Sequence, residues 1–249
     1  MLGFRVSIEA YSRDFERVMD EVLSIALSER PKVVVDVGVG DSTKALLGRS
    51  IELLIVIDVD CAKLRDFAPR LRCGDLSIEF LCGDVSMSPF RSTSIDLAVL
   101  HFVLHEVDPA RHEAIIRELG RVSRYVLIAE PLPQGSELYN VLASVWRRAM
   151  RSVGRFEEYR DPSYWIKVVL RAGLAIVKTK LVRWRAAVPY EVMEVLVHSW
   201  IREWESLGVP NKIIEELKSL LGLCKVEELR WSDTFAILAT SSLARRLKG

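Results

Sequence analysis

Residues 33–42 read VVVDVGVGDS, which is a run of β-branched residues followed by two glycines, an aspartate and a serine. The run is typical of a short buried strand. The glycines allow the backbone to turn tightly and to come close to a ligand. The polar residues after them favour the start of a helix, whose free N–H groups can donate hydrogen bonds to that ligand. The stretch therefore predicts a strand, a ligand-binding loop and a helix.

Similar patterns surround this unit on both sides. Strand-like runs lie at 53–60, 77–84, 94–100, 124–131, 175–184 and 233–240, and helical patterns lie at 10–29, 110–122, 136–153, 161–172 and 190–221, the last broken near 208–210. Several strands are apolar on both faces, as in parallel sheets covered by helices. The alternation predicts a doubly wound α/β fold with a mostly parallel seven-stranded sheet, helices on both faces and a helical insertion before the last strand.

Composition excludes some classes of protein. The chain has 249 residues, 50% of them hydrophobic, and 35 Lys and Arg against 34 Asp and Glu, so its formal charge of +1 argues against a polyanion binder that uses its whole surface. No apolar run approaches the roughly 18 residues of a membrane span. The first residues mix both charge signs and contain no apolar signal core, so we expect a cytoplasmic protein without a membrane partner. We also expect a single domain over 1–249.

Amides and cysteines bear on the source of the protein. The chain contains one glutamine and only two asparagines, a depletion that fits a hyperthermophile, although drift in a small sample is the alternative.

The four cysteines form no C-x-x-C and no zinc-finger spacing. We expect buried thiols, and a Cys73–Cys82 disulfide is the alternative in a hyperthermophile.

An acidic residue follows the second strand. Asp58 lies about 20 residues after the glycine turn, the spacing at which a carboxylate meets ribose hydroxyls in nucleotide-binding units. A carboxylate can accept hydrogen bonds from both hydroxyls. The alternative is an ordinary turn capped by aspartate. Thr43 replaces the third glycine of G-x-G-x-x-G, which argues against a dinucleotide, and no P-loop motif is present.

Four motifs together resemble the class I S-adenosylmethionine-dependent methyltransferases, and most closely the group that acts on small molecules. They are DVGVGDS, IVIDVD, GDVSMSPFRSTSIDLAVLHFVLHEVD and LIAEP, all within 30–131. The resemblance implies S-adenosyl-L-methionine as cofactor, a cofactor-binding half over 30–131, and an acceptor-side half over 132–249 with a helical lid at about 189–222.

The resemblance also implies the cofactor contacts. In this family the D-x-G-x-G loop packs against the methionine and sugar, the strand-end acid binds the ribose, and a G-D pair contacts the adenine amino group. The matching residues are Asp36, Gly38 and Gly40 in the loop, Asp58 and Val59 after the second strand, Asp84 and Val85 after the third, and His101 beside the methyl group. The chain departs from the family where Glu106 replaces a frequent second histidine, and it lacks the N-P-P-Y signature of amino-group methylation.

Histidines are the candidates for proton transfer. A base is needed only when the acceptor must lose a proton, and imidazole suits this at neutral pH. His101 and His105 are the candidates, with packing or helix capping as the alternative role. We expect no metal site on His101, His105 and His112, because Pro109 interrupts the segment and H-E-x-x-H is absent.

The acceptor depends on the second half of the chain. Segments 146–160, 183–185 and 200–204 interleave arginine with aromatic residues, a pattern used in RNA binding but also found on solvated helices anchored by tryptophan. The segment 189–221 is rich in valine and tryptophan and resembles an apolar lid. We therefore expect methyl transfer to a small, partly apolar acceptor. The alternatives are an RNA or protein methyltransferase and a non-catalytic cofactor-binding module, and the oligomeric state stays open.

Overall fold

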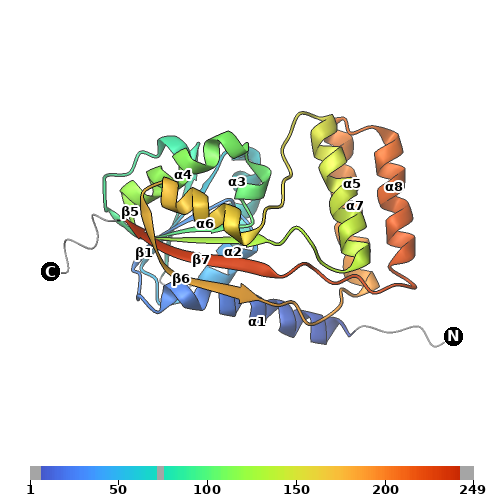
Figure 1. The fold of residues 1–249 in the computed structure, drawn as a ribbon, viewed down its shortest axis with the longest axis horizontal. Helices are drawn as coiled ribbons and strands as arrows, with labels where there is room; N and C mark the ends of the chain where they lie inside the picture. The colour runs from blue at the N-terminus through green and yellow to red at the C-terminus, as the bar shows by residue number, and fades with distance from the viewer. Residues whose placement is uncertain (1–6, 72–75, 242–249) are drawn as a thin grey trace.

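The structure is a computed structural model that describes residues 7–71 and 76–241 (Figure 1). Seven strands form one sheet in the order β3-β2-β1-β4-β5-β7-β6. They are β1 (Val33–Val37), β2 (Leu53–Asp58), β3 (Ser77–Cys82), β4 (Ile95–His101), β5 (Ser123–Pro131), β6 (Leu174–Val182) and β7 (Thr234–Ser241). The pairs among β1 to β5 are parallel, whereas β7 is antiparallel to both β5 and β6. The predicted mostly parallel, seven-stranded sheet is confirmed.

Helices cover both faces of the sheet. They are α1 (Ile8–Leu27), α2 (Asp41–Leu46), α3 (Cys61–Phe67), α4 (Pro109–Val122) and α6 (Pro162–Arg171), with short 3-10 turns η1 (Ala68–Arg70), η2 (Val85–Met87) and η3 (Leu104–Glu106). Side chains of α4 and α6 pack with one face of the sheet, and those of α1, α2 and α3 pack with the other. Val34 and Val35 are both fully buried but belong to opposite faces, because successive strand side chains alternate. Both faces therefore read as apolar in the sequence.

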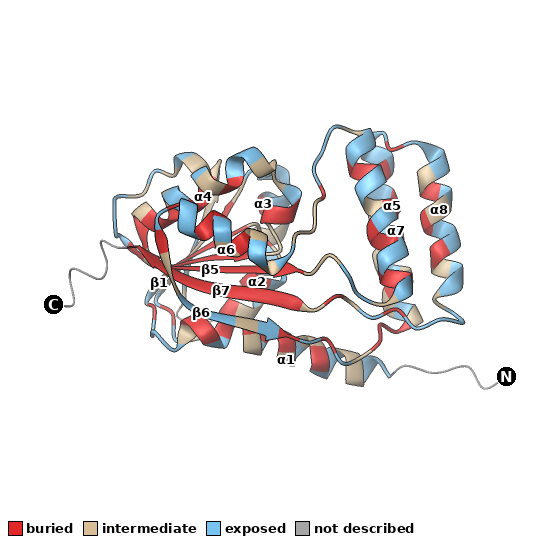
Figure 2. Cartoon of the chain, in the orientation of Figure 1, coloured by how far each residue is buried: buried red, intermediate tan, exposed pale blue. Residues whose placement is uncertain are grey.

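Three further helices form a layer of their own beyond the sheet, which we call the cap. It consists of α5 (Glu137–Ser152), α7 (Tyr190–Leu207) and α8 (Asn211–Leu223), seen at the right of Figures 1 and 2. Their facing sides share one apolar cluster in which Trp204 and Leu217 are fully buried. The segment 189–222, which is expected to form a lid, folds as α7 and the greater part of α8, and both helices pack with α5.

The break between α7 and α8 has a local cause. Gly208 ends α7 in the left-handed conformation with φ of +79°, which glycine adopts without a side-chain clash. Pro210 then precedes α8 and cannot continue a helix across the turn. Among the described residues, no helix is long and apolar enough to cross a bilayer.

A disulfide joins the start of α3 to the end of β3. Cys61, the first residue of α3, is bonded to Cys82, the last residue of β3, with a Cα–Cα distance of 5.2 Å. The expectation of buried thiols is therefore wrong for these two residues. The alternative partner Cys73 lies outside the described residues, and Cys82 is already bonded to Cys61. Parallel pairing of β2 and β3 sets Cys82 opposite Asp58 and so brings it beside Cys61, a contact that cysteine spacing does not indicate.

Removing this disulfide is expected to lower the free energy of unfolding by about 3 kcal/mol, because the bond closes a loop across a sequence separation of 21 residues. Denaturant unfolding of Cys61→Ser with and without reductant measures the loss. Reductant should destabilise the wild type and leave Cys61→Ser unchanged, and Cys224→Ser, which removes a free thiol, serves as the matched control. Equal sensitivity to reductant in wild type and Cys61→Ser would contradict the assignment.

Candidate active site

The predicted site residues gather at the carboxyl edge of the sheet. The chain runs outward from β1 to β2 and β3 and then returns to β4 on the other side of β1. Loops at such a reversal diverge and leave a crevice for a ligand. The loops after β1, β2 and β4 meet at this point.

Asp36 lies beneath the loop that follows β1. Its carboxylate is fully buried and accepts hydrogen bonds from Ser42 Oγ at 3.0 Å and Thr43 Oγ1 at 2.6 Å. Burial raises the pKa of Asp36 to about 7, although the hydroxyls of Thr43 and Ser42 act in the opposite direction. Asp36 therefore positions the loop on α2, and we assign it no direct contact with a ligand.

The two loop glycines serve different purposes. Gly38 has φ of +81°, and a Cβ there would lie 2.9 Å from Val103 Cγ2 in the loop after β4. A side chain at Gly38 would therefore strain the backbone and separate the two loops. A Cβ at Gly40 would meet nothing within 4 Å, so this part of the loop borders open space. That space can admit a ligand against the backbone.

Asp58 is held in place by hydrogen bonds from the backbone of the loops around it. Its Oδ2 accepts a hydrogen bond from Val39 N–H at 2.9 Å, its Oδ1 accepts one from Asp60 N–H at 2.9 Å, and Lys63 Nζ lies 3.7 Å from Oδ2. A carboxylate has about four acceptor positions, so capacity remains for two ligand hydroxyls. The next side chain, Val59, is 71% exposed and offers an apolar surface beside that carboxylate.

Asp84 has partners that the sequence analysis did not anticipate. It caps η2 by accepting hydrogen bonds from Ser86 N–H at 2.9 Å and Ser86 Oγ at 2.8 Å, and Arg111 of α4 forms an ion pair with it. Burial alone would raise the pKa of Asp84, but the Ser86 and Arg111 contacts outweigh it and lower the pKa. Its neighbour Val85 is buried in the core, which places the valine under the site and not in it.

His101 ends β4 with a neutral side chain. Its ring stacks on Phe102 with a centroid distance of 4.2 Å, and Phe102 has φ of +57°, an uncommon value for a side chain of this size. His101 Nε2 is buried and has no hydrogen-bond partner among the described residues. Burial lowers the pKa of His101 to about 4. This imidazole is therefore neutral at pH 7, and its Nε2 can accept a hydrogen bond.

Glu130, at the end of β5, holds the loop after β4. It is 1% exposed; its Oε1 accepts hydrogen bonds from Val103 N–H at 3.1 Å and Leu104 N–H at 2.7 Å. Its Oε2 accepts a hydrogen bond from His105 Nδ1 at 2.7 Å. One buried carboxylate thus fixes both the backbone of η3 and the orientation of His105.

His105 differs from His101 in charge. Burial lowers the pKa of His105, but the carboxylates of Glu130, Glu157 and Glu106 outweigh burial and raise it to about 9. The imidazole is therefore charged at neutral pH and cannot accept a further proton. Of the two candidate bases, only His101 has a neutral ring at pH 7.

Two residues after α5 complete the surroundings of His105. Tyr159 stacks on His105 with a centroid distance of 5.4 Å, and its hydroxyl donates a hydrogen bond to Glu157. Burial raises the pKa of Glu157 to about 7, while His105 and the Tyr159 hydroxyl act to lower it. Sequence reasoning missed Glu130, Glu157 and Tyr159. Only Glu130 carried a signal, as a charged residue within the apolar run 124–131.

His112 is separate from this cluster. Its Nδ1 lies 3.0 Å from Tyr164 Oη and its Nε2 lies 3.0 Å from Val107 O, so both ring nitrogens are engaged inside the fold. The trio of His101, His105 and His112 is therefore not gathered around one point.

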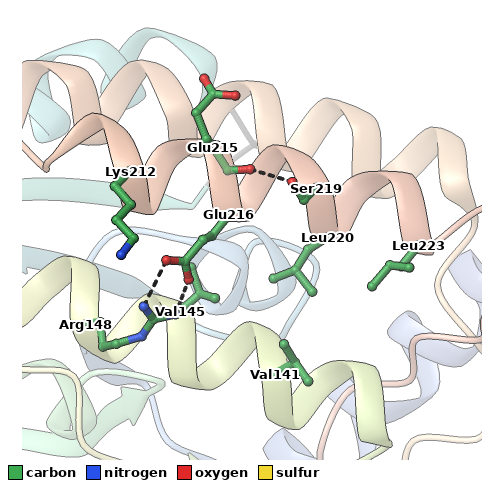
Figure 3. Close-up of a pocket in the computed structure, with 9 residues that line it drawn as sticks. All are labelled: Val141, Val145, Arg148, Lys212, Glu215, Glu216, Ser219, Leu220 and Leu223. Atoms are coloured by element: carbon green, nitrogen blue, oxygen red, sulfur yellow. Dashed lines mark hydrogen bonds and ion pairs between the residues drawn. The ribbon is translucent and has the colours of Figure 1, made fainter.

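A groove on the cap lies apart from the candidate site. It runs between α5 and α8, where an ion pair between Arg148 and Glu216 crosses it (Figure 3). Its lining residues are Val141, Val145, Arg148, Lys212, Glu215, Glu216, Ser219, Leu220 and Leu223. None of the predicted cofactor residues lines it, so we do not assign the ligand site there.

Comparison with known proteins agrees with this geometry. Residues 35–125 match the family model described as a methyltransferase domain. The YcgJ protein of Bacillus subtilis aligns with a TM-score of 0.60 and 14% identity over 90% of this chain and 98% of its own. A SAM-dependent methyltransferase of Archaeoglobus fulgidus aligns with a TM-score of 0.55 and 14% identity over 91% of this chain and 94% of its own. No curated protein sequence matches the chain.

The fold and the site define a class I, Rossmann-like methyltransferase architecture. The match covers 35–125 of the 249 residues, and S-adenosyl-L-methionine is the cofactor that the sequence motifs imply. The residues present fit that cofactor, because Gly40 borders open space, Asp58 keeps acceptor capacity for two hydroxyls, and Val59 exposes an apolar side chain next to it.

Proposed function

We propose that the chain transfers a methyl group from S-adenosyl-L-methionine to a small, partly apolar acceptor. The observation that carries the proposal is the convergence, at the reversal of strand order, of the glycine loop, the Asp58 carboxylate and the neutral His101 ring. Each comes from the end of a different parallel strand.

The cofactor, when bound, supplies an electrophilic methyl group. Asp58 would accept hydrogen bonds from the ribose hydroxyls, and the backbone at Gly40 would contact the cofactor closely. His101 would accept a hydrogen bond from a hydroxyl acceptor and orient it, because its ring is neutral and its Nε2 has no partner among the described residues. Alignment of the two reactants supplies much of the remaining acceleration.

The cap supports a small acceptor. Partial desolvation and the nearby Glu106 of η3 raise the pKa of Glu203 in α7, so α7 comes close to the loop after β4. Met193 and Val197 of α7 pack inside the cap with α5 and α8, which holds the helix in this position. A helix in this place limits the size of the acceptor and excludes water from the site.

The arginine and tryptophan segments favour the small acceptor over RNA. Trp146 packs against Trp200 and Trp204 inside the cap, with centroid distances of 4.6 and 5.2 Å. Arg148 is paired with Glu216, and Arg160 with Glu158. Stacking on RNA bases needs exposed rings and free cations.

The remaining alternative is a cofactor-binding protein that transfers no methyl group. The [4+2]-cyclase SpnF aligns with a TM-score of 0.58 and 16% identity over 91% of this chain and 80% of its own. One fold thus carries different reactions, and activity must be tested directly.

The test is methyl transfer from labelled S-adenosyl-L-methionine. The protein is incubated with a panel of small hydroxyl, carboxyl and amine compounds and, separately, with tRNA and rRNA. We expect label in a small hydroxyl compound, and at least a tenfold loss of kcat in His101→Gln. His198→Gln, a histidine exposed on α7, is the control and should keep its activity. Label in RNA, or full activity of His101→Gln, would contradict the proposal.

A further inference from the structure

One cluster of ligating side chains has no place in the proposed methyl transfer. It consists of His105 and Glu106 in η3 and Glu157 after α5, whose ligating atoms all lie within 4.8 Å of one another. His105 Nε2 is 3.7 Å from Glu157 Oε1 and 3.9 Å from Glu106 Oε1. The three side chains therefore point toward a common centre.

The two distances are too long for hydrogen bonds. His105 Nε2 donates no hydrogen bond to any residue that the structure describes, although the side chain is only 8% exposed. Ligands that share a zinc ion each lie about 2.0–2.2 Å from it, which separates them by roughly 3–4 Å. The distances of 3.7 and 3.9 Å from His105 Nε2 to the two carboxylates fall in this range.

The neighbouring residues orient the cluster. Glu130 Oε2 accepts the Nδ1–H of His105 at 2.7 Å, so Nε2 is the nitrogen directed at the two carboxylates. Metal-bound histidines usually donate their other N–H to a carboxylate in this way. Tyr159 holds Glu157 by donating a hydrogen bond to its Oε1.

The negative charge of the carboxylates around His105 also favours a bound cation. Glu130 and Glu157 are 1% and 5% exposed, and Glu106 stands at the rim of the same cluster. Buried carboxylates need a cation or several hydrogen bonds to offset the loss of hydration. His105 is the only side-chain cation in contact with these three carboxylates among the described residues.

We propose that His105 Nε2, Glu157 and Glu106 bind one divalent transition-metal ion of the zinc type, with Glu130 orienting the histidine and the Nε2 proton of His105 released to solvent as the metal binds. A mixed imidazole and carboxylate set suits zinc and its neighbours better than magnesium or calcium. Three protein ligands leave a coordination position open. The site revises the expectation of no metal, because Glu157 is distant in sequence and follows no ligand motif. It does not depend on the proposed methyl transfer.

The test uses the full chain with Cys73 and Cys224, the two cysteines outside the disulfide, replaced by serine. The protein is stripped with chelator and dialysed, then titrated with Zn²⁺ by calorimetry and with Co²⁺ by visible absorption. We expect one ion per chain and a Co²⁺ spectrum typical of a bound ion. Glu106→Gln should weaken binding at least tenfold, and Glu157→Gln and His105→Gln should abolish it.

Two matched controls separate this site from general metal binding. Glu158→Gln changes the neighbouring carboxylate, which pairs with Arg160, and His112→Gln changes a histidine outside the cluster. Both should bind Zn²⁺ as the parent does. Absence of binding in the parent, or unchanged affinity in Glu106→Gln, would overturn the proposal. Glu106 is 63% exposed, so its substitution tests the site without unfolding the chain. Calorimetry with S-adenosyl-L-methionine on the same samples reports separately on the cofactor site.

Discussion

Asp58→Asn is expected to weaken the binding of S-adenosyl-L-methionine at least about 100-fold. The carboxylate keeps acceptor capacity for both ribose hydroxyls, and a hydrogen bond to a charged group contributes about 1.5–3 kcal/mol. The amide retains one oxygen and presents N–H groups where acceptors are needed. Calorimetric titration of the cofactor into wild type and variant measures the change.

Asp96→Asn is the matched control. Asp96 accepts hydrogen bonds from Lys32 N–H at 2.8 Å and Val33 N–H at 2.9 Å, two backbone bonds like those of Asp58, but near the start of β1, away from the cofactor site. The two variants should lose similar stability, and only Asp58→Asn should lose affinity. Cofactor affinity of Asp58→Asn within threefold of the wild type would rule out the assigned ribose contact.

Glu130→Gln is expected to lower the free energy of unfolding by about 3 kcal/mol at pH 6, measured by denaturant unfolding with chelator present. The substitution removes the buried negative charge that faces His105. Removing one partner of a buried ion pair lowers the free energy of unfolding by about 3–5 kcal/mol. The loop after β4 should loosen too, because Val103 and Leu104 donate to the same carboxylate.

The pH dependence of this loss has a definite sign. The folded pKa of His105, about 9, lies above the ordinary histidine value of 6.5, so its stabilising contribution is complete below pH 6.5 and is lost as pH rises through 9. The difference between wild type and Glu130→Gln should therefore shrink over that range. Glu118→Gln, which breaks a partly exposed pair with Arg121, should cost no more than about 1 kcal/mol. If Glu130→Gln lowered the free energy of unfolding by as little as Glu118→Gln does, the stabilising role of the buried pair between Glu130 and His105 would be contradicted.

The sequence alone determined the sheet and the cofactor edge. Strand and helix patterns are local, because the spacing of apolar residues along a short stretch shows which of its faces is buried. The strands β1 to β5 could be predicted from such stretches. The glycine loop and Asp58 could be predicted as ligand residues because ligand contacts in this fold lie directly after a strand. The helix break at Gly208 was equally local, since glycine and proline act on their own backbone.

Only the tertiary structure decided which distant residues meet. The Cys61–Cys82 bond depends on the register of β2 with β3, and the addition of α5 to the cap depends on packing against α7 and α8. His101 and His105 looked equivalent in sequence, yet one is neutral and the other charged. The difference arises because Glu130 and Glu157, brought from remote segments, face only His105 at close range. Charge in a buried site is set by neighbours in space, and a linear pattern does not record them.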